Sequence, residues 1–226
     1  MEYIIDALPA LLLGARATLW LTIRAIIFGF IGGTLLGTAR LSKFKIVRLL
    51  TRAYIEFFRG TPLLVQIYWI YFGFPALFKA VGLDFTFDRE FAGVLALSLN
   101  AAAYIAEIVR GGIQSIDRGQ WEASSSMGLD SIQTLRYIVL PQALRRMIPP
   151  LGNEFITLLK DTSLVSVISL EELLRRGELI VATNFRAFEI YTAIGLIYLL
   201  MNLTFSQGFA WLERWTDPAE KAKRLA

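Results

Sequence analysis

The feature that most constrains the fold is a series of long apolar stretches separated by short polar connections. The stretches lie at about residues 11–37, 63–80, 91–109, 143–168 and 187–211. Each is close to the roughly 20 residues that an α-helix needs to cross the hydrocarbon core of a bilayer. An α-helix makes its backbone hydrogen bonds within one segment, which is necessary in a hydrocarbon core that contains no water. We therefore predict an all-α integral membrane protein with about five transmembrane helices, forming a single transmembrane domain over residues 1–226.

Composition supports this class and removes several kinds of chemistry. Hydrophobic residues make up 55% of the chain and the mean hydropathy is +0.53, well above a typical soluble domain. The sequence contains no cysteine and no histidine. Disulfides are therefore excluded, and so are metal sites and acid–base catalysis that depend on these two residue types.

The distribution of basic residues predicts the orientation of the chain in the membrane. The connections after the first and third stretches carry an excess of Arg and Lys, whereas the connection after the second is nearly balanced. Because cytoplasmic loops carry this excess, the N-terminus is expected outside and the C-terminus inside. The residues concerned are Arg40, Lys43, Lys45, Arg48, Arg52 and Arg59 in the first connection, and Arg110, Arg118, Arg136, Arg145 and Arg146 in the third. The run at 217–224 is expected to be a solvated tail.

The third connection, about residues 111–141, is polar and long enough for two short helices. Trp121 offers an apolar anchor beside an amphipathic turn, and Gly128 permits a tight break between one short helix and the next. Pro141 restricts the residue before it and is expected to mark a helix boundary. Such a loop usually contacts something outside the bilayer, although an interfacial helix without a partner is the alternative.

The spacing within this connection resembles the EAA loop of bacterial ABC importer permeases. That loop reads Glu-Ala-Ala, three residues, Gly, nine residues, then Ile-x-Leu-Pro. Ser124 stands where the family prefers Ala, and both side chains are small. The resemblance implies a cytoplasmic coupling helix that docks on an ATPase. The positions that carry it are Glu122, Ala123, Ser124, Gly128, Ile138, Leu140 and Pro141.

Segments 56–66, 106–113 and 152–164 are similar to polar amino acid permeases, which import histidine, glutamine, glutamate and arginine among others. The resemblance implies a type I ABC importer fold in the bacterial cytoplasmic (inner) membrane, in contact with membrane lipid. It also implies three kinds of partner: ABC ATPase subunits, a second permease subunit that is identical or related, and an extracytoplasmic amino-acid-binding protein. No nucleic acid is expected. ATP and Mg would bind on the ATPase, since this chain has no Gly-x-x-x-x-Gly-Lys-Ser/Thr loop and no cofactor of its own is expected.

Polar residues inside the apolar stretches are the candidate solute-binding residues, because they are costly at membrane depth unless they are used. In the fourth stretch, Glu154, Thr157 and Asp161 share one helical face. Carboxylates there would suit the ammonium group of an amino acid. Lys160, hydroxyl groups or helix N-termini would suit its carboxylate, and a helix break at 161–163 could expose backbone dipoles. The full candidate set is Thr61, Gln66, Asn100, Tyr104, Glu107, Glu154, Thr157, Lys160, Asp161 and Ser163.

Structural roles compete with solute binding at several of these positions. Glu107 lies on one helical face with Asn100 and Tyr104, but it could also pair with Arg110 three residues on. Lys160 and Asp161 could fix a helix end. The glycines of the first stretch are expected to form a close-packing face, and they are Gly29, Gly32, Gly33 and Gly37. Pro149, Pro150 and Gly152 are expected to interrupt the start of the fourth stretch.

Together with these observations, the resemblance implies a permease subunit of an ATP-driven amino acid importer that forms the translocation pathway and is not itself an enzyme. One alternative is a passive channel or secondary transporter for small polar solutes. Another is an intramembrane enzyme built on Ser163 and Lys160, although the sequence lacks a Gly-x-Ser-x-Gly nucleophile elbow. The five apolar stretches and the EAA spacing favour the permease.

Overall fold

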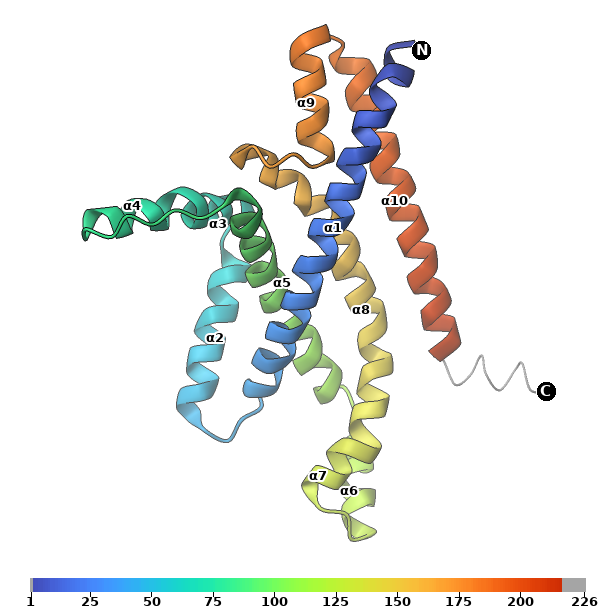
Figure 1. Ribbon diagram of the computed structural model, residues 1–226. Helices are drawn as coiled ribbons and strands as arrows, with labels where there is room; N and C mark the ends of the chain where they lie inside the picture. Colours follow the sequence, from blue (N-terminus) through green and yellow to red (C-terminus); the bar gives the residue numbers. More distant parts are fainter. Residues whose placement is uncertain (1, 217–226) are drawn as a thin grey trace, which may run out of the picture.

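The computed structural model describes residues 2–216, which are mostly helical (Figure 1). The long helix α1 (Glu2–Ala39) is followed by α2 (Lys45–Gly60), which runs back in the opposite direction beside its second half. Next come α3 (Leu63–Tyr68), the π-helical segment η1 (Trp69–Gly73) and α4 (Phe74–Ala80), joined end to end. The expected solvated tail at 217–224 lies outside the described residues.

The second part of the chain begins with α5 (Arg89–Gln114), which leads to the short helix α6 (Arg118–Ser126). The segments α7 (Ser131–Thr134), π-helical η2 (Leu135–Val139) and α8 (Leu140–Asp161) follow in direct succession. A 3₁₀ segment, η3 (Thr162–Ile168), then leads to α9 (Leu173–Asn184) and to the long α10 (Ala187–Thr216).

Within residues 2–216, four helical segments are long and apolar enough to cross a membrane: Tyr3–Ala39, Leu63–Ala80, Arg89–Gln114 and Ala187–Thr216. They correspond to the first, second, third and fifth predicted stretches. The fourth stretch falls on α8 and η3, which are more polar because α8 contains two arginines, a lysine and two carboxylates. This helix packs against α1, α5 and α10.

Two features of the first half differ from the sequence-based expectation. The basic connection after α1 is mostly the helix α2, whose charged residues are exposed while Thr51 and Ile55 are buried. The α3–α4 segment is helical as predicted, but it extends sideways across the direction of α1 and α5 (Figure 1). Length and hydropathy indicate that a segment can span a membrane, not how it is tilted.

The close-packing face predicted for α1 is confirmed. A Cβ added at Gly29, Gly33 or Gly37 would lie 2.6–2.8 Å from atoms of α5. These positions are four residues apart, and they meet α5 at progressively later residues, so the two helices run in the same direction. Removing three side chains from one face lets the backbones approach, as small residues do in membrane helices.

The prediction that prolines interrupt the fourth stretch was wrong. α8 continues through Pro149 and Pro150 to Asp161, whereas Pro141 lies in its first turn, at the boundary between η2 and α8 that was expected there. A proline removes one backbone donor, and the π-helical segment η2 immediately before Pro141 is a common way to accommodate a local defect. Neighbouring helices hold such a helix together, because Met147 and Gly152 pack against α5 and α10.

A buried carboxylate joins α1, α9 and α10. Glu172 caps α9 by accepting hydrogen bonds from the N–H groups of Leu174 (2.9 Å) and Arg175 (2.8 Å). The Tyr198 hydroxyl of α10 donates to the same carboxylate at 2.9 Å, and the Thr18 hydroxyl of α1 donates at 3.4 Å. A buried charge is tolerated when its acceptor positions are satisfied in this way.

We expect Glu172→Ala to lower the free energy of unfolding by about 3 kcal/mol, because several buried donors lose their acceptor at once. The matched control is Glu171→Ala, which removes an exposed carboxylate that pairs with Arg176 at 3.3 Å and should cost less than about 1 kcal/mol. Thermal unfolding of the purified proteins in detergent measures both. Equal destabilisation by the two substitutions would contradict the role assigned to Glu172.

Candidate functional site

A polar cavity of about 410 Å³ lies where α2, α3, α5 and α8 meet. We refer to it as the polar cavity. Side chains from several parts of the sequence converge there, and the junction of α2 and α3 contributes Gly60, Pro62 and Leu63. Six of the ten candidate solute-binding residues also line it: Thr61, Asn100, Tyr104, Glu154, Thr157 and Asp161.

Helical spacing explains why these residues meet. Glu154, Thr157 and Asp161 lie three and four residues apart on α8, so they project from one face. Asn100 and Tyr104 are likewise four apart on α5. Pro62 forces an extended conformation on the residue before it, which ends α2 and brings that turn to the cavity wall.

The polar cavity holds opposite charges. Arg59, the penultimate residue of α2, lines it together with the carboxylates of Glu154 and Asp161. The Arg59 charge attracts the Glu154 carboxylate, whereas Asp161 repels it. The Arg59 guanidinium also lies 5.2 Å from the centre of the Tyr104 ring, a cation–π distance. The cavity therefore offers a guanidinium and two carboxylates to whatever enters it.

Arg59 was missed as a site residue, because the sequence placed it among the basic residues of a connection. The signal that could have found it is its position directly before Gly60-Thr61-Pro62, a turn that was already selected for Thr61. An arginine at the end of a helix, next to a turn that enters an apolar region, is well placed to reach membrane depth.

Gln66 supports the wall of the polar cavity without lining it. Its side chain is buried, and its amide nitrogen donates to the carbonyl of Phe58 (2.8 Å) and to the carbonyl and hydroxyl of Thr61 (3.0 and 2.9 Å). Its amide oxygen accepts a hydrogen bond from Asn100 at 2.9 Å. These bonds fix two uncharged cavity residues, Thr61 in the turn before α3 and Asn100 on α5.

The remaining three candidates lie away from the polar cavity. Glu107 forms an ion pair with Arg110 at 2.6 Å and approaches Arg40 at 3.8 Å, which is the structural alternative expected from its spacing. Lys160 is exposed beside Asp161, and Ser163 lies on η3. Neither of these two is among the residues that line the cavity.

The expected change of helix at 161–163 is present, but it does not expose an N-terminus. α8 ends at Asp161 and the chain continues directly into the 3₁₀ segment η3. The Asp161 side chain makes no cap, and the Thr162 hydroxyl donates back to the carbonyl of Leu159 at 2.7 Å. The backbone therefore offers no free N–H cluster at this point.

The loop between α5 and α8 has the predicted break at Gly128. This residue has φ +83°, and the N–H groups of Gly128 and Leu129 close the end of α6 on the carbonyls of Ser125 (3.0 Å) and Ser124 (3.1 Å). That pattern is the Schellman motif, which favours glycine. Asp130 then begins α7 with a capping box that includes Gln133.

This loop forms one end of the molecule, with α6 and α7 beyond the other helices (Figure 1). Trp121 packs against the main apolar core, as expected of an anchor, and the Ser124 side chain is buried. The other predicted coupling positions are exposed: Glu122, Ala123, Gly128, Leu140 and Pro141. Sequence reasoning did not select other exposed apolar side chains on this loop, of which the most exposed are Met127, Ile132 and Tyr137.

Comparison with known proteins gives consistent matches over most of the chain. The family model described as binding-protein-dependent transport system inner membrane component matches residues 6–218. The glutamine transport system permease protein GlnP of Escherichia coli (strain K12) is 44% identical over 208 residues, covering 92% of this chain and 93% of that protein. The probable amino-acid permease protein YxeN of Bacillus subtilis (strain 168) is 40% identical over 205 residues, covering 91% and 90%.

One solved structure is similar in both sequence and fold. It is described as an amino acid ABC transporter with histidines, and it superimposes with a TM-score of 0.87 at 40% identity. The match covers 93% of this chain and 95% of that one.

Proposed function

This chain belongs to the family of binding-protein-dependent transport system inner membrane components, and we propose how it binds solute and which partners it uses. It is the transmembrane permease subunit of an amino-acid ABC importer, with the type I importer fold, in the inner membrane. The observation that carries the proposal for its solute site is the polar cavity, where Arg59 lies among Glu154 and Asp161.

A free amino acid occupies the polar cavity during transport. Its carboxylate pairs with Arg59, and its ammonium group or cationic side chain pairs with Glu154 and Asp161. Planar guanidinium groups bind carboxylates through two parallel hydrogen bonds, so this pairing is specific as well as attractive. The amide of Asn100 and the hydroxyl of Thr157 complete the polar wall. The glutamine and histidine named for the relatives are solutes of this type.

The loop between α5 and α8, which consists of α6, α7 and η2, is called the α6–α7 loop. It docks on a cytosolic ATPase subunit, which binds ATP and Mg and hydrolyses ATP. Support comes from the EAA spacing and from the apolar side chains of Met127, Ile132 and Tyr137, which are 83%, 76% and 60% exposed. Exposed apolar groups gathered at a polar end of a membrane protein suit a protein partner. The chain itself lacks a phosphate-binding loop.

The chain lies with its N-terminus outside and its C-terminus inside, and it works with a second permease subunit and an extracytoplasmic amino-acid-binding protein. The α1–α2 connection and the α6–α7 loop lie toward one end of the molecule, as does the end of α10, while the start of α1 lies at the other (Figure 1). This arrangement agrees with the side expected for each from the distribution of basic residues.

Reconstitution with the ATPase and the binding protein tests this role against a passive channel. We expect amino acid uptake only with hydrolysable ATP on the side of the α6–α7 loop. A non-hydrolysable analogue on the same side should give no accumulation against a gradient. Equal uptake without ATP would favour the channel, and uptake driven by an ion gradient alone would favour a secondary transporter.

A further inference from the structure

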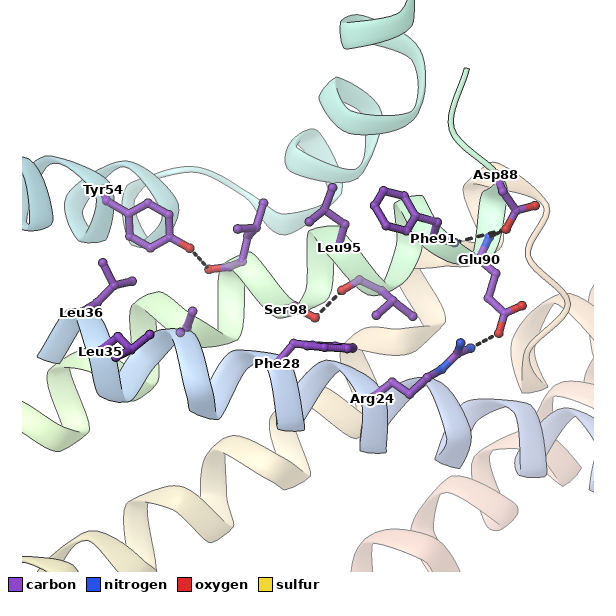
Figure 2. A pocket seen from close by; sticks show the side chains of 14 residues that line it. Arg24, Phe28, Leu35, Leu36, Tyr54, Asp88, Glu90, Phe91, Leu95 and Ser98 are labelled. Carbon is purple, nitrogen blue, oxygen red and sulfur yellow. Dashed lines mark hydrogen bonds and ion pairs between the residues drawn. The ribbon is translucent and has the colours of Figure 1, made fainter. Parts of the chain in front are cut away.

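A second cavity of about 750 Å³ lies between α1, α2 and the first half of α5, and it shares no lining residue with the polar cavity (Figure 2). We refer to it as the α1–α5 groove. Its walls are mainly apolar, with Phe28, Leu35 and Leu36 on α1 facing Phe91 and Leu95 on α5. The solute proposed above is too polar for such walls, so the groove suits a different occupant.

The polar groups along the groove are already used within the protein. The Tyr54 hydroxyl donates to the carbonyl of Leu99 at 2.8 Å, and the Ser98 hydroxyl donates to the carbonyl of Val94 at 2.6 Å (Figure 2). A ligand lying there would find no free donor from either side chain. The part of the groove near these side chains is therefore suited to a hydrocarbon chain, which needs no hydrogen-bond partner.

One end of the groove is charged. Arg24 of α1 forms an ion pair with Glu90, and Asp88 lies at the same end of the groove (Figure 2). Tyr54 lies at the other end. The Nε–H of Arg24 is buried and has no hydrogen-bond partner. The Arg24 guanidinium also lies 5.2 Å from the Trp20 ring, and tryptophan is enriched where a membrane helix meets the headgroups.

The unused buried donor of Arg24 indicates an anionic group of a ligand. Asp88 accepts hydrogen bonds from the N–H groups of Glu90 (3.0 Å) and Phe91 (3.3 Å), and Glu90 pairs with Arg24. Because a carboxylate has more than one acceptor position, both can still contact a cationic group of the same ligand.

We propose that the α1–α5 groove binds one phospholipid of the surrounding bilayer. An acyl chain lies along the apolar walls, the phosphate contacts Arg24, and an ammonium headgroup contacts Asp88 and Glu90. Because two carboxylates accompany one arginine here, a headgroup that is only anionic would be repelled, whereas phosphatidylethanolamine is complementary.

The test is lipid titration of the full-length chain, purified in detergent with its bound subunits and observed by native mass spectrometry. We expect phosphatidylethanolamine to bind at one copy per chain, at least tenfold more tightly than phosphatidylglycerol or diacylglycerol. Arg24→Gln should weaken this binding about tenfold, and Leu95→Trp should fill the groove and abolish lipid binding. Leu35→Trp is a second filling variant at a position that is 65% exposed, where the fold tolerates a large side chain.

Matched controls separate the groove from general lipid binding. Arg16→Gln removes the other arginine within α1, and Leu200→Trp adds the same ring at an exposed position of α10; neither residue lines the groove. Both controls should bind lipid as the unmodified chain does. Equal binding by all variants, or equal binding of phosphatidylglycerol, would overturn the proposal. Cross-linking of Leu35→Cys to a second permease copy would also overturn it, because a protein would then fill the groove.

Discussion

Amino acid uptake is expected to fall about tenfold or more when Glu154 is replaced by glutamine, a loss of roughly 1.4 kcal/mol of binding free energy. Glutamine keeps the shape of the side chain and removes its charge, so the ammonium group of the solute loses a charge-assisted hydrogen bond. Glu154 lines the polar cavity together with Asp161 and faces the charge of Arg59. Uptake by proteoliposomes that contain the complete importer measures the change.

The matched control is Lys160→Gln, which also removes one charge from the last two turns of α8. Lys160 is exposed and does not line the polar cavity, so uptake should stay within about twofold of the unmodified chain. The affinity of the binding protein for the amino acid should be the same with either variant. Unaltered uptake kinetics in Glu154→Gln, with normal expression and ATP hydrolysis, would assign Glu154 a structural role.

Gly128→Val is expected to abolish uptake while the ATPase subunits continue to hydrolyse ATP. Gly128 has φ +83°, and a β-branched residue in this conformation is strained by at least about 1–2 kcal/mol. The Schellman end of α6 would open, and the angle between α6 and α7 would change. No atom lies within 4 Å of a Cβ added at this glycine, so the effect comes from the backbone alone.

Gly128→Asn separates conformation from side-chain size, because asparagine tolerates the left-handed region better than other residues. Gly128→Asn should retain most of the uptake that is lost in Gly128→Val. Parallel assays of ATP hydrolysis and uptake on the two variants give the coupling ratio. If Gly128→Val transports as the unmodified chain does, the loop is not the coupling element.

The features that follow from helical periodicity were predictable from the sequence. Glu154, Thr157 and Asp161 were placed on one face from their spacing, and the glycines of α1 were placed on another. The same rule did not separate Glu107 from Tyr104, since both lie on one face of α5. That face extends from the polar cavity to a cluster of arginines, and only the packing of α1 and α2 shows where the cavity ends.

Other features depend on how helices pack and could not be read from the sequence. The charged side chains of α2 gave that segment the appearance of a connection, although its opposite face is buried against α5. Arg59 becomes a cavity residue only because the turn at Thr61 and Pro62 directs the end of α2 toward α8. Hydropathy likewise gave the length of the α3–α4 segment and not its direction.

Solute binding in the polar cavity can be measured directly, because the chain has no cysteine and one introduced thiol is the only one to react. In Thr157→Cys the thiol lines the cavity, and in Ser126→Cys it lies exposed on the loop outside it. With the amino acid at ten times its dissociation constant, modification of Thr157→Cys by a water-soluble thiosulfonate reagent should slow about tenfold, and modification of Ser126→Cys should not change. An unchanged rate at Thr157→Cys, or equal slowing at both positions, would contradict binding in this cavity.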